Sequence, residues 1–342
     1  MFFIISSTCL GSVQLFIVQP TPHHDKYLIV AQDGESPAQA MNRYKTLLRN
    51  SPHLSSLVSP EQLKQFSYGH GDYFELGEKP AVLILANRGY DLSNEEKSGG
   101  QLRVQKFKEK IGQNNDVYIL PVAAALGLTK LNRELFYKSL TDKFSGVVAL
   151  GGPDVNPSVY GDENREAREV NLYRDQYEIH FLKHWISAKK GFLFGVCRGH
   201  HMISAALGFK LVQHVENHGD GVWVDHPIKF LKTAQNFLSR AAGVREMIVN
   251  SYHHQAVKYS PHPDIDLAAV APDNTVEALE SKDGRIVSTQ FHVEFMENIF
   301  AEKIFSRINE KFRENFRTAN EKFRAESQKN HSAKAGMCSH LF

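Results

Sequence analysis

The stretch that decides the fold is Gly-Phe-Leu-Phe-Gly-Val-Cys-Arg-Gly-His, residues 191–200. Its apolar run at 192–196 predicts a fully buried strand, because it does not alternate with polar residues. The pattern at 199–207 then predicts a helix. A lone cysteine between such a strand and helix, with glycines on both sides, is the thiol counterpart of the serine nucleophile elbow.

Cys197 is therefore a candidate nucleophile. Its place at a helix N-terminus favours the thiolate, which is the reactive form. The turn needs small residues around it because the backbone doubles back on itself there. The alternative is a buried structural cysteine, since free cysteine often behaves as a small hydrophobic residue. The flanking Gly195 and Gly199 favour the nucleophile.

The composition is that of an ordinary soluble globular protein, with 42% hydrophobic and 23% charged residues. A formal net charge of +2 gives no reason to expect a nucleic-acid partner. The three cysteines, Cys9, Cys197 and Cys338, lie far apart and form neither a disulfide framework nor a zinc pattern. The 17 histidines are scattered, so we expect no metal and no cofactor.

Residues 1–79 are expected to form an N-terminal α+β extension of unknown role. Strands are predicted at 2–6, 13–18 and 27–31, and the Ser-Pro pairs at 36–37 and 59–60 predict two helix starts. The apolar N-terminus has no preceding Lys or Arg and no obvious cleavage site, and polar residues interrupt it too often for a membrane span. We therefore expect a cytoplasmic location and no membrane partner, with an unusual signal peptide as the alternative.

From residue 80 the chain alternates short apolar strands with helices, which predicts an α/β fold with a doubly wound, mostly parallel sheet. Before the elbow, strands are expected at 81–86, 117–120 and 147–150. Helices are expected near 101–111, 132–143 and 169–189. The aromatic residues spaced along the last helix are interpreted as core packing.

The region 210–290 is predicted to be mainly β, with a hairpin turn at Asp283-Gly284. A charged helix is then expected at 298–326, and its apolar face is expected to comprise Phe305, Ile308, Phe312, Phe316, Ala319 and Phe323. This face packs either on the domain itself or on a second copy of the chain in a homodimer. Residues 327–342 are expected to be disordered.

A cysteine nucleophile needs a base and a group that orients the base. His292 ends a predicted strand, and Glu294, two residues later, can project to the same side. The alternative is an exposed His and Glu in a loop, because this pattern alone is weak.

An acyl-transfer site also needs backbone N–H groups that stabilise an oxyanion. The strand at 147–150 runs into Gly151-Gly152-Pro153-Asp154, where the backbone can approach a ligand. We predict that the N–H groups of Gly152 and Arg198 form the oxyanion hole. The alternative is a plain turn, but the elbow, the glycine turn and His-x-Glu in this order are more specific together than singly.

On these motifs, residues 80–307 resemble the class I glutamine amidotransferase superfamily. The resemblance is to the γ-glutamyl hydrolases, in particular the γ-glutamyl-γ-aminobutyrate hydrolase type of the C26 peptidases. The matching segments are Gly-Gly-Pro-Asp-Val-Asn-Pro-Ser-Val-Tyr-Gly at 151–161, Arg174-Asp175 with Glu178, Gly-Val-Cys-Arg-Gly at 195–199, Val-Asn-Ser-Tyr-His-His-Gln at 249–255 and Gln-Phe-His-Val-Glu at 290–294. The resemblance implies a flavodoxin-like hydrolase domain at 80–308, with the extension at 1–79 and a charged helix and disordered tail at 309–342 outside it.

The resemblance also implies a mechanism. Cys197 would attack the γ-carbonyl of a small γ-glutamyl substrate to form a thioester. His292, oriented by Glu294, would protonate the leaving amine and then activate water. Substrate contacts are implied at Gly151, Asp154, His201, Ser251, His253, His254 and Gln255, although the histidine pair could equally be structural.

Two positions depart from the family pattern. His201 stands where the family usually has Gln, and Val293 stands where it usually has Pro. Two other functions therefore remain open: a glutaminase subunit that supplies ammonia to a separate synthase, and a binding or regulatory module without turnover. No synthase or nucleotide-binding motif is seen, and the complete Cys-His-Glu set favours an enzyme.

Overall fold

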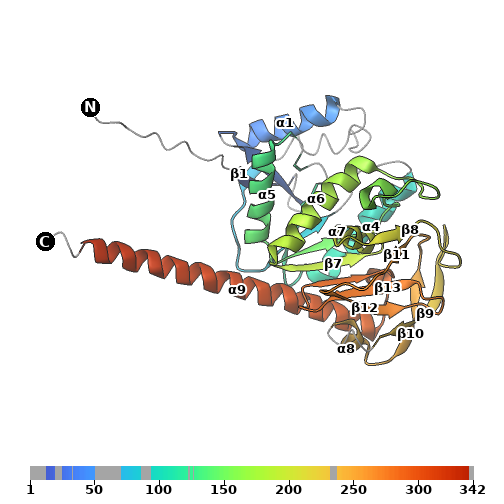
Figure 1. Cartoon of the computed structure of the whole chain (residues 1–342). Coiled ribbons are helices and arrows are strands. Elements are labelled where there is room, and N and C mark those ends of the chain that lie inside the picture. Colours follow the sequence, from blue (N-terminus) through green and yellow to red (C-terminus); the bar gives the residue numbers. More distant parts are fainter. Residues whose placement is uncertain are drawn as a thin grey trace.

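A single large sheet organises the protein (Figure 1). The computed structural model describes residues 13–19, 25–32, 34–50, 71–85, 94–121, 124–125, 127–231 and 237–338. Within them the sheet has 12 strands in the order β10-β9-β12-β13-β14-β7-β6-β4-β5-β2-β1-β3. Cys9, the strand predicted at 2–6 and the helix start predicted at 59–60 lie outside the described residues.

The six central strands run parallel to one another. They are buried and almost wholly apolar, as strands are when helices cover both faces of a sheet. This confirms the predicted doubly wound α/β fold. The strands are, in spatial order, β2 (Lys26–Gln32), β5 (Asp116–Leu120), β4 (Ala81–Leu85), β6 (Gly146–Ala149), β7 (Phe192–Val196) and β14 (Ile286–Thr289).

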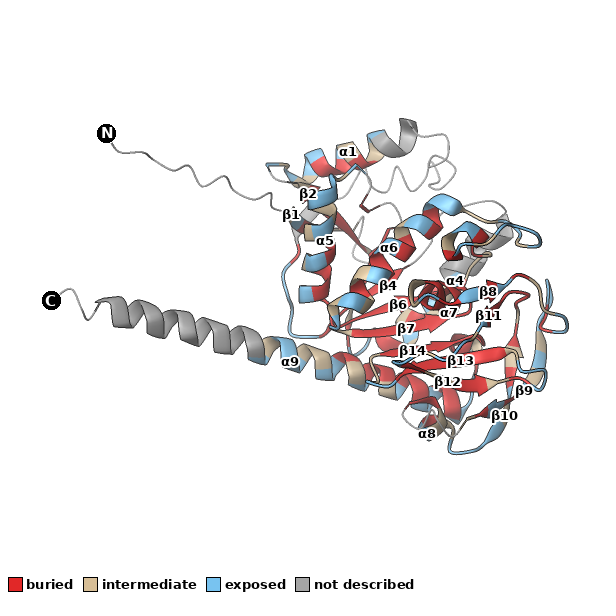
Figure 2. Cartoon of the chain, viewed as in Figure 1, coloured by how far each residue is buried: buried red, intermediate tan, exposed pale blue. Residues whose placement is uncertain are grey.

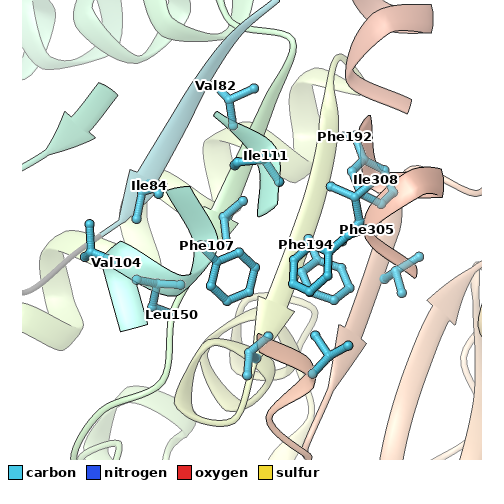
Figure 3. Close-up of a cluster of buried hydrophobic side chains, with 14 of the residues drawn as sticks. Val82, Ile84, Val104, Phe107, Ile111, Leu150, Phe192, Phe194, Phe305 and Ile308 are labelled. Carbon is cyan, nitrogen blue, oxygen red and sulfur yellow. The ribbon is translucent and has the colours of Figure 1, made fainter. Parts of the chain in front are cut away.

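Helices cover both faces of this sheet (Figures 1 and 2). One face carries α1 (Pro37–Asn50), α4 (Asn94–Ile111), α8 (Leu238–Ala242) and α9 (Ile299–Cys338). The other carries α5 (Lys130–Lys143), α6 (Leu172–Ala188) and α7 (Arg198–Ala206). Figure 3 shows the first face, where Phe107 of α4 meets Phe305 of α9 edge-on at 5.5 Å between ring centroids. The aromatic stripe of α6 is core packing in part, with Phe181 and Trp185 buried.

Antiparallel strands extend the sheet beyond β14, as the mainly β prediction for 210–290 required. They are β13 (Val276–Ser281), β12 (Ile265–Val270), β9 (Val224–Phe230) and β10 (Glu246–Ser251). The predicted hairpin turn joins β13 to β14, and Gly284 adopts a φ of +69° there. A separate two-stranded sheet pairs β8 (Lys210–Val212) with β11 (Ala256–Lys258).

The N-terminal strands form one end of the same sheet, with β3 at its edge. β1 (Val13–Val18) pairs antiparallel with β2 and with β3 (Gly71–Tyr73), and β2 pairs parallel with β5. The extension therefore continues the main sheet instead of forming a sheet of its own. The boundary at residue 79 stays a prediction.

The C-terminal helix is longer than expected. Disorder from residue 327 was the wrong prediction for 327–338, because α9 continues to Cys338 through a segment that contains no proline. The first part of its predicted apolar face packs on its own domain, where Phe305, Ile308 and Phe312 are buried. Farther along, Phe316 is half-buried and Ala319 is exposed. The far end of α9 extends away from the body of the molecule (Figure 1). Among the described helices, none has the length and apolar character needed to cross a bilayer.

Candidate active site

Cys197 lies where β7 ends and α7 begins, as predicted. Its backbone has φ of +51° and ψ of −113°, a conformation that non-glycine residues adopt only under strain. The Cys197 N–H donates to the Thr289 carbonyl oxygen at 2.8 Å, which ties the turn to β14. The residue is only 6% exposed, so Cys197 is largely shielded from bulk solvent.

The flanking glycines are required by close contacts. A Cβ atom on Gly199 would lie 2.0 Å from the Ala149 carbonyl oxygen. A Cβ on Gly195 would lie 2.5 Å from Cδ1 of Ile203 and 3.0 Å from the backbone of Gly199. The elbow therefore packs backbone against backbone, with α7 pressed onto β6.

His292 and Glu294 lie just past the end of β14, next to the elbow strand. Nδ1 of His292 is 2.7 Å from Oε1 of Glu294, and both side chains are fully buried. The turn at Val293–Phe295 is a short 3-10 helix closed by the Phe295 N–H on the His292 carbonyl at 3.2 Å. Val293 thus supports this geometry in place of the family's usual proline.

Asn250 fixes the backbone of His292 from both sides. Its Oδ1 accepts from the His292 N–H at 2.9 Å, and its Nδ2 donates to the His292 carbonyl at 3.0 Å. Asn250 lies on β10, an edge strand that β9, β12 and β13 separate from β14 in the sheet order. This pair of hydrogen bonds positions the imidazole.

The pKa of His292 is raised to about 9. Burial alone would lower it, but the Glu294 carboxylate and then Cys197 favour the imidazolium more strongly. Nε2 of His292 is buried without a hydrogen bond of ordinary geometry among the described residues, so the influence of Cys197 is mainly that of a nearby charge. The glycine turn reaches the same ring, since a Cβ on Gly151 would lie 2.9 Å from Cε1 of His292.

A buried charge network holds the start of α7. The Arg198 guanidinium donates to the carboxylates of Asp175 and Glu178, both on α6. Arg174 donates to Glu178 at 2.8 Å. Although burial opposes it, the two guanidinium groups hold the pKa of Glu178 below its usual value. Asp175 also accepts from the Asn156 N–H at 2.8 Å, which anchors the loop that follows the glycine turn.

The two residues predicted to supply the oxyanion hole are neighbours in the fold. A Cβ on Gly152 would lie 3.2 Å from Cδ of Arg198 and 2.9 Å from Nη1 of Arg174. As the first residue of α7, Arg198 has a backbone N–H without a partner four residues earlier in the helix. The fold thus brings Gly152 and Arg198 together beside Cys197.

A cavity of about 510 Å³ opens onto Cys197. Trp223, which is 51% exposed, forms part of its wall and stands edge-on to His292 at 5.2 Å between ring centroids. Six of the predicted site residues line the cavity besides Cys197: Gly152, Asp154, His201, His253, His254 and Gln255.

Several predicted substrate contacts hold the wall in place instead. The Ser251 hydroxyl donates to the His218 carbonyl at 2.8 Å, and Ser251 does not line the cavity. Gln255 accepts from the Val155 N–H at 2.9 Å. Oδ2 of Asp154 accepts from Nε2 of His254 at 2.7 Å. Substrate contact at these residues stays a prediction.

His201 lies in the cavity wall with Nε2 at 2.6 Å from Oε1 of Gln290. Burial lowers its pKa to about 3, so the ring is neutral at physiological pH. The amide oxygen only accepts, so Nε2 of His201 carries the proton. His201, one of the two residues that depart from the family pattern, is therefore a neutral part of the wall that Gln290 holds in place.

Sequence reasoning missed Asn250, Trp223 and Arg103. Asn250 lies inside the matched segment at 249–255, but only the fold shows that it faces His292. Trp223 follows a run of polar and glycine residues that carries no recognisable signal. Arg103 lines the cavity, and its Nε is buried without a hydrogen-bond partner among the described residues.

Comparisons with known proteins show which family the sequence is similar to. A family model described as peptidase C26 matches residues 96–294. The chain is 30% identical over 171 residues to protein NtpR of Enterococcus hirae, a match that covers 45% of this chain and 68% of NtpR. It is also 30% identical over 171 residues to YvdE of Lactococcus lactis, which is named as a glutamine amidotransferase-like protein; that match covers 46% of this chain and 68% of YvdE. It is 24% identical over 294 residues to the carbamoyl phosphate synthase small chain of Helicobacter pylori, covering 81% of this chain and 64% of that protein.

Proposed function

The chain belongs to the peptidase C26 family, within the glutamine amidotransferase-like proteins, and from this premise we propose that it hydrolyses the γ-glutamyl amide bond of small γ-glutamyl compounds. Membership supports an amidohydrolase-type enzyme. The observation that carries the finer proposal is the buried His292–Glu294 pair next to Cys197, which itself lines the cavity. We assign Cys197 as nucleophile, His292 as acid and base, and Glu294 as the group that orients His292.

In the first half-reaction the Cys197 thiolate attacks the γ-carbonyl carbon. The carbonyl oxygen takes up the negative charge, and the N–H groups of Gly152 and Arg198 stabilise it. The C–N bond then breaks while His292 donates its Nε2 proton to the leaving nitrogen. The products of this step are an amine and a glutamyl thioester on Cys197. The raised pKa of His292 supports its role as the acid.

In the second half-reaction His292 acts as the base. It is neutral after giving up its proton, and the acylated sulfur no longer carries a charge that favours the imidazolium. His292 takes a proton from water, the hydroxyl adds to the thioester carbon, and the C–S bond breaks. Glutamate leaves, and the thiolate and imidazolium are restored.

The charges around the cavity suit a glutamyl group. Such a group carries an α-carboxylate and an α-ammonium besides the scissile amide. Arg103 offers a guanidinium to the carboxylate, and its buried Nε has no other partner among the described residues. The acidic residues Asp154, Glu169 and Asp220 line the same cavity and suit the ammonium.

A second candidate function is a glutaminase that supplies ammonia to a separate synthase. The similarity to a carbamoyl phosphate synthase small chain favours it, because that protein is named as one chain of a synthase. The chemistry at Cys197 would be the same, with glutamine as substrate and ammonia as leaving group. The two functions differ in whether turnover needs a partner chain.

The test is glutamate release from γ-glutamyl-γ-aminobutyrate, other γ-glutamyl amides and glutamine. We expect turnover by the protein alone, and a loss of about a thousandfold or more in Cys197→Ala. A thioester should be trapped on the native chain by rapid acid quench and detected by mass spectrometry, but not on Cys197→Ala. Absence of release from every substrate would refute the hydrolase, whereas release from glutamine only with a synthase chain added would favour the glutaminase.

A further inference from the structure

A second cluster of titratable side chains lies behind the cavity wall. His218 comes from the loop before β9, His226 from β9, His253 from the loop after β10 and Glu277 from β13. One ligand atom from each lies within 4.8 Å of all the others. Because these residues are not grouped in one short motif, no pattern in the sequence indicates a metal site there.

Each of the three imidazoles uses its outer nitrogen as a hydrogen-bond donor. Nε2 of His218 is 2.9 Å from the Asp273 carboxylate, and Nδ1 of His226 is 3.1 Å from the Pro227 carbonyl. Nδ1 of His253 is 2.9 Å from the Gln255 carbonyl. Carboxylate and carbonyl oxygens only accept, so these nitrogens carry the protons. In a neutral ring the inner nitrogen is then unprotonated and offers its lone pair.

The inner nitrogens converge on Glu277 without a hydrogen-bond partner. Nδ1 of His218, Nε2 of His226 and Nε2 of His253 are buried and unpaired among the described residues, as are both oxygens of Glu277. Three lone pairs and a carboxylate therefore face one another away from water. Such a group of acceptors is costly unless a cation lies among them.

The spacing fits metal ligands and not hydrogen bonds. Oε1 of Glu277 lies 3.6 Å from His218, 3.5 Å from His226 and 3.7 Å from His253. These separations exceed the 2.7–3.2 Å of a hydrogen bond of this kind by roughly half an ångström. Ligands at about 2.0–2.1 Å from a tetrahedral zinc ion lie roughly 3.3–3.4 Å apart. A proton on Glu277 would satisfy only one of the three nitrogens.

We propose that His218, His226, His253 and Glu277 together bind one divalent transition-metal ion, with zinc as the best fit. Three imidazoles and a carboxylate complete a tetrahedral set, so the site is structural and leaves no open position for catalysis. The hydrogen bonds to Asp273, Pro227 and Gln255 are the outer contacts that orient metal-binding histidines.

The ion would brace the cavity wall. His253 itself lines the cavity, and the His218 carbonyl accepts from the Ser251 hydroxyl at 2.8 Å and from the His253 N–H at 3.0 Å. The ion would thus tie the loop that carries Trp223 to the segment at 251–255 and to β13. A second group, His214, Asp220 and His254, carries no such proposal because His254 is already bonded through both nitrogens.

The first test measures the metal in the full-length protein purified without chelators. We expect inductively coupled plasma mass spectrometry to find about one zinc ion per chain, both in the native protein and in Cys197→Ala. His226→Ala and Glu277→Gln should lose it, while His214→Ala, from the second group, should retain it. Metal retained in both cluster variants would overturn the proposal.

The second test avoids the risk that a buried variant fails to fold. Asp273 is 53% exposed, so Asp273→Asn should leave the fold intact. After removal of metal by a chelator, Zn²⁺ affinity is measured by competition with a chromogenic indicator. We expect binding at one equivalent, a rise in Tm on addition, and roughly 10- to 100-fold weaker binding in Asp273→Asn. A native chain that takes up no Zn²⁺, or that binds it as tightly as Asp273→Asn does, would refute the site.

Discussion

Nδ1 of His292 lies 2.7 Å from Oε1 of Glu294, and neither side chain is exposed to solvent. The carboxylate accepts the Nδ1 proton, which leaves Nε2 as the nitrogen that exchanges a proton with the reacting groups. Because the pair is buried, the carboxylate acts on the ring with little screening by solvent. The protonation state of His292 therefore depends on Glu294 over the whole working pH range.

This relationship predicts the alkaline limit of the activity. The pKa of His292 is raised to about 9, so the ring is an imidazolium below that pH and loses its proton above it. The leaving amine then has no acid, and kcat/KM should fall as pH rises through about 9. In Glu294→Gln the charge that raises the pKa is gone, and the limit should move down by at least about one pH unit. An alkaline limit unchanged in Glu294→Gln would contradict this pairing.

The same shift bears on stability. The pKa of His292 rises from 6.5 in the unfolded chain to about 9 in the folded chain. Folding therefore gains stability from the imidazolium, and this contribution is fully present below about pH 6.5. That contribution is lost as pH rises through about 9. The free energies of unfolding of the native protein and of Glu294→Gln, measured in urea between pH 6 and pH 10, should become more alike toward pH 10.

Asn250 should matter for rate through the placement of His292. Its side chain holds both the N–H and the carbonyl of His292. In Asn250→Ala the ring is no longer fixed, and a displacement of about 1 Å can cost on the order of 100-fold in rate. We expect kcat to fall by 10- to 100-fold with KM nearly unchanged. The control is Asn315→Ala on α9, which removes a hydrogen bond to the Ser145 carbonyl oxygen and should keep full activity. Equal kcat values in the two variants would argue against a positioning role.

The elbow glycines should differ sharply from a turn glycine in their tolerance of a methyl group. A Cβ on Gly199 would lie 2.0 Å from the Ala149 carbonyl oxygen, and two backbones cannot separate without moving α7 off β6. Gly199→Ala should therefore lower the free energy of unfolding by about 3 kcal/mol or more. Gly284 has open space around it and only a φ of +69° to maintain, so Gly284→Ala should cost about 1–2 kcal/mol. Urea unfolding followed by circular dichroism measures both, and a Gly199→Ala cost no greater than that of Gly284→Ala would show that the elbow can relax.

The sequence predicted the parts whose signal is local. The strand before Cys197, the glycines around it and the helix after it are contiguous, so periodicity and glycine positions were enough. The parts it missed depend on contacts between distant segments. Asn250 reaches His292 across 42 residues, and His218 meets Glu277 only because a loop and a strand converge. The N-terminal strands also looked separate, since only pairing of β2 with β5 joins them to the main sheet.

The last prediction concerns the buried charges beneath the oxyanion donors. Glu178 binds Arg174 and Arg198 at once, and all three side chains are buried. Glu178→Ala removes a buried carboxylate that both guanidinium groups share, and breaking a buried pair in this way costs about 3–5 kcal/mol. The exposed pair Lys311–Glu314 is the matched control, where Lys311→Ala should cost less than about 1 kcal/mol. Because the start of α7 would shift with Arg198, Glu178→Ala should also lower kcat, whereas Lys311→Ala should not. A Glu178→Ala variant with native stability and native kcat would mean that Arg198 is held by Asp175 and by packing alone.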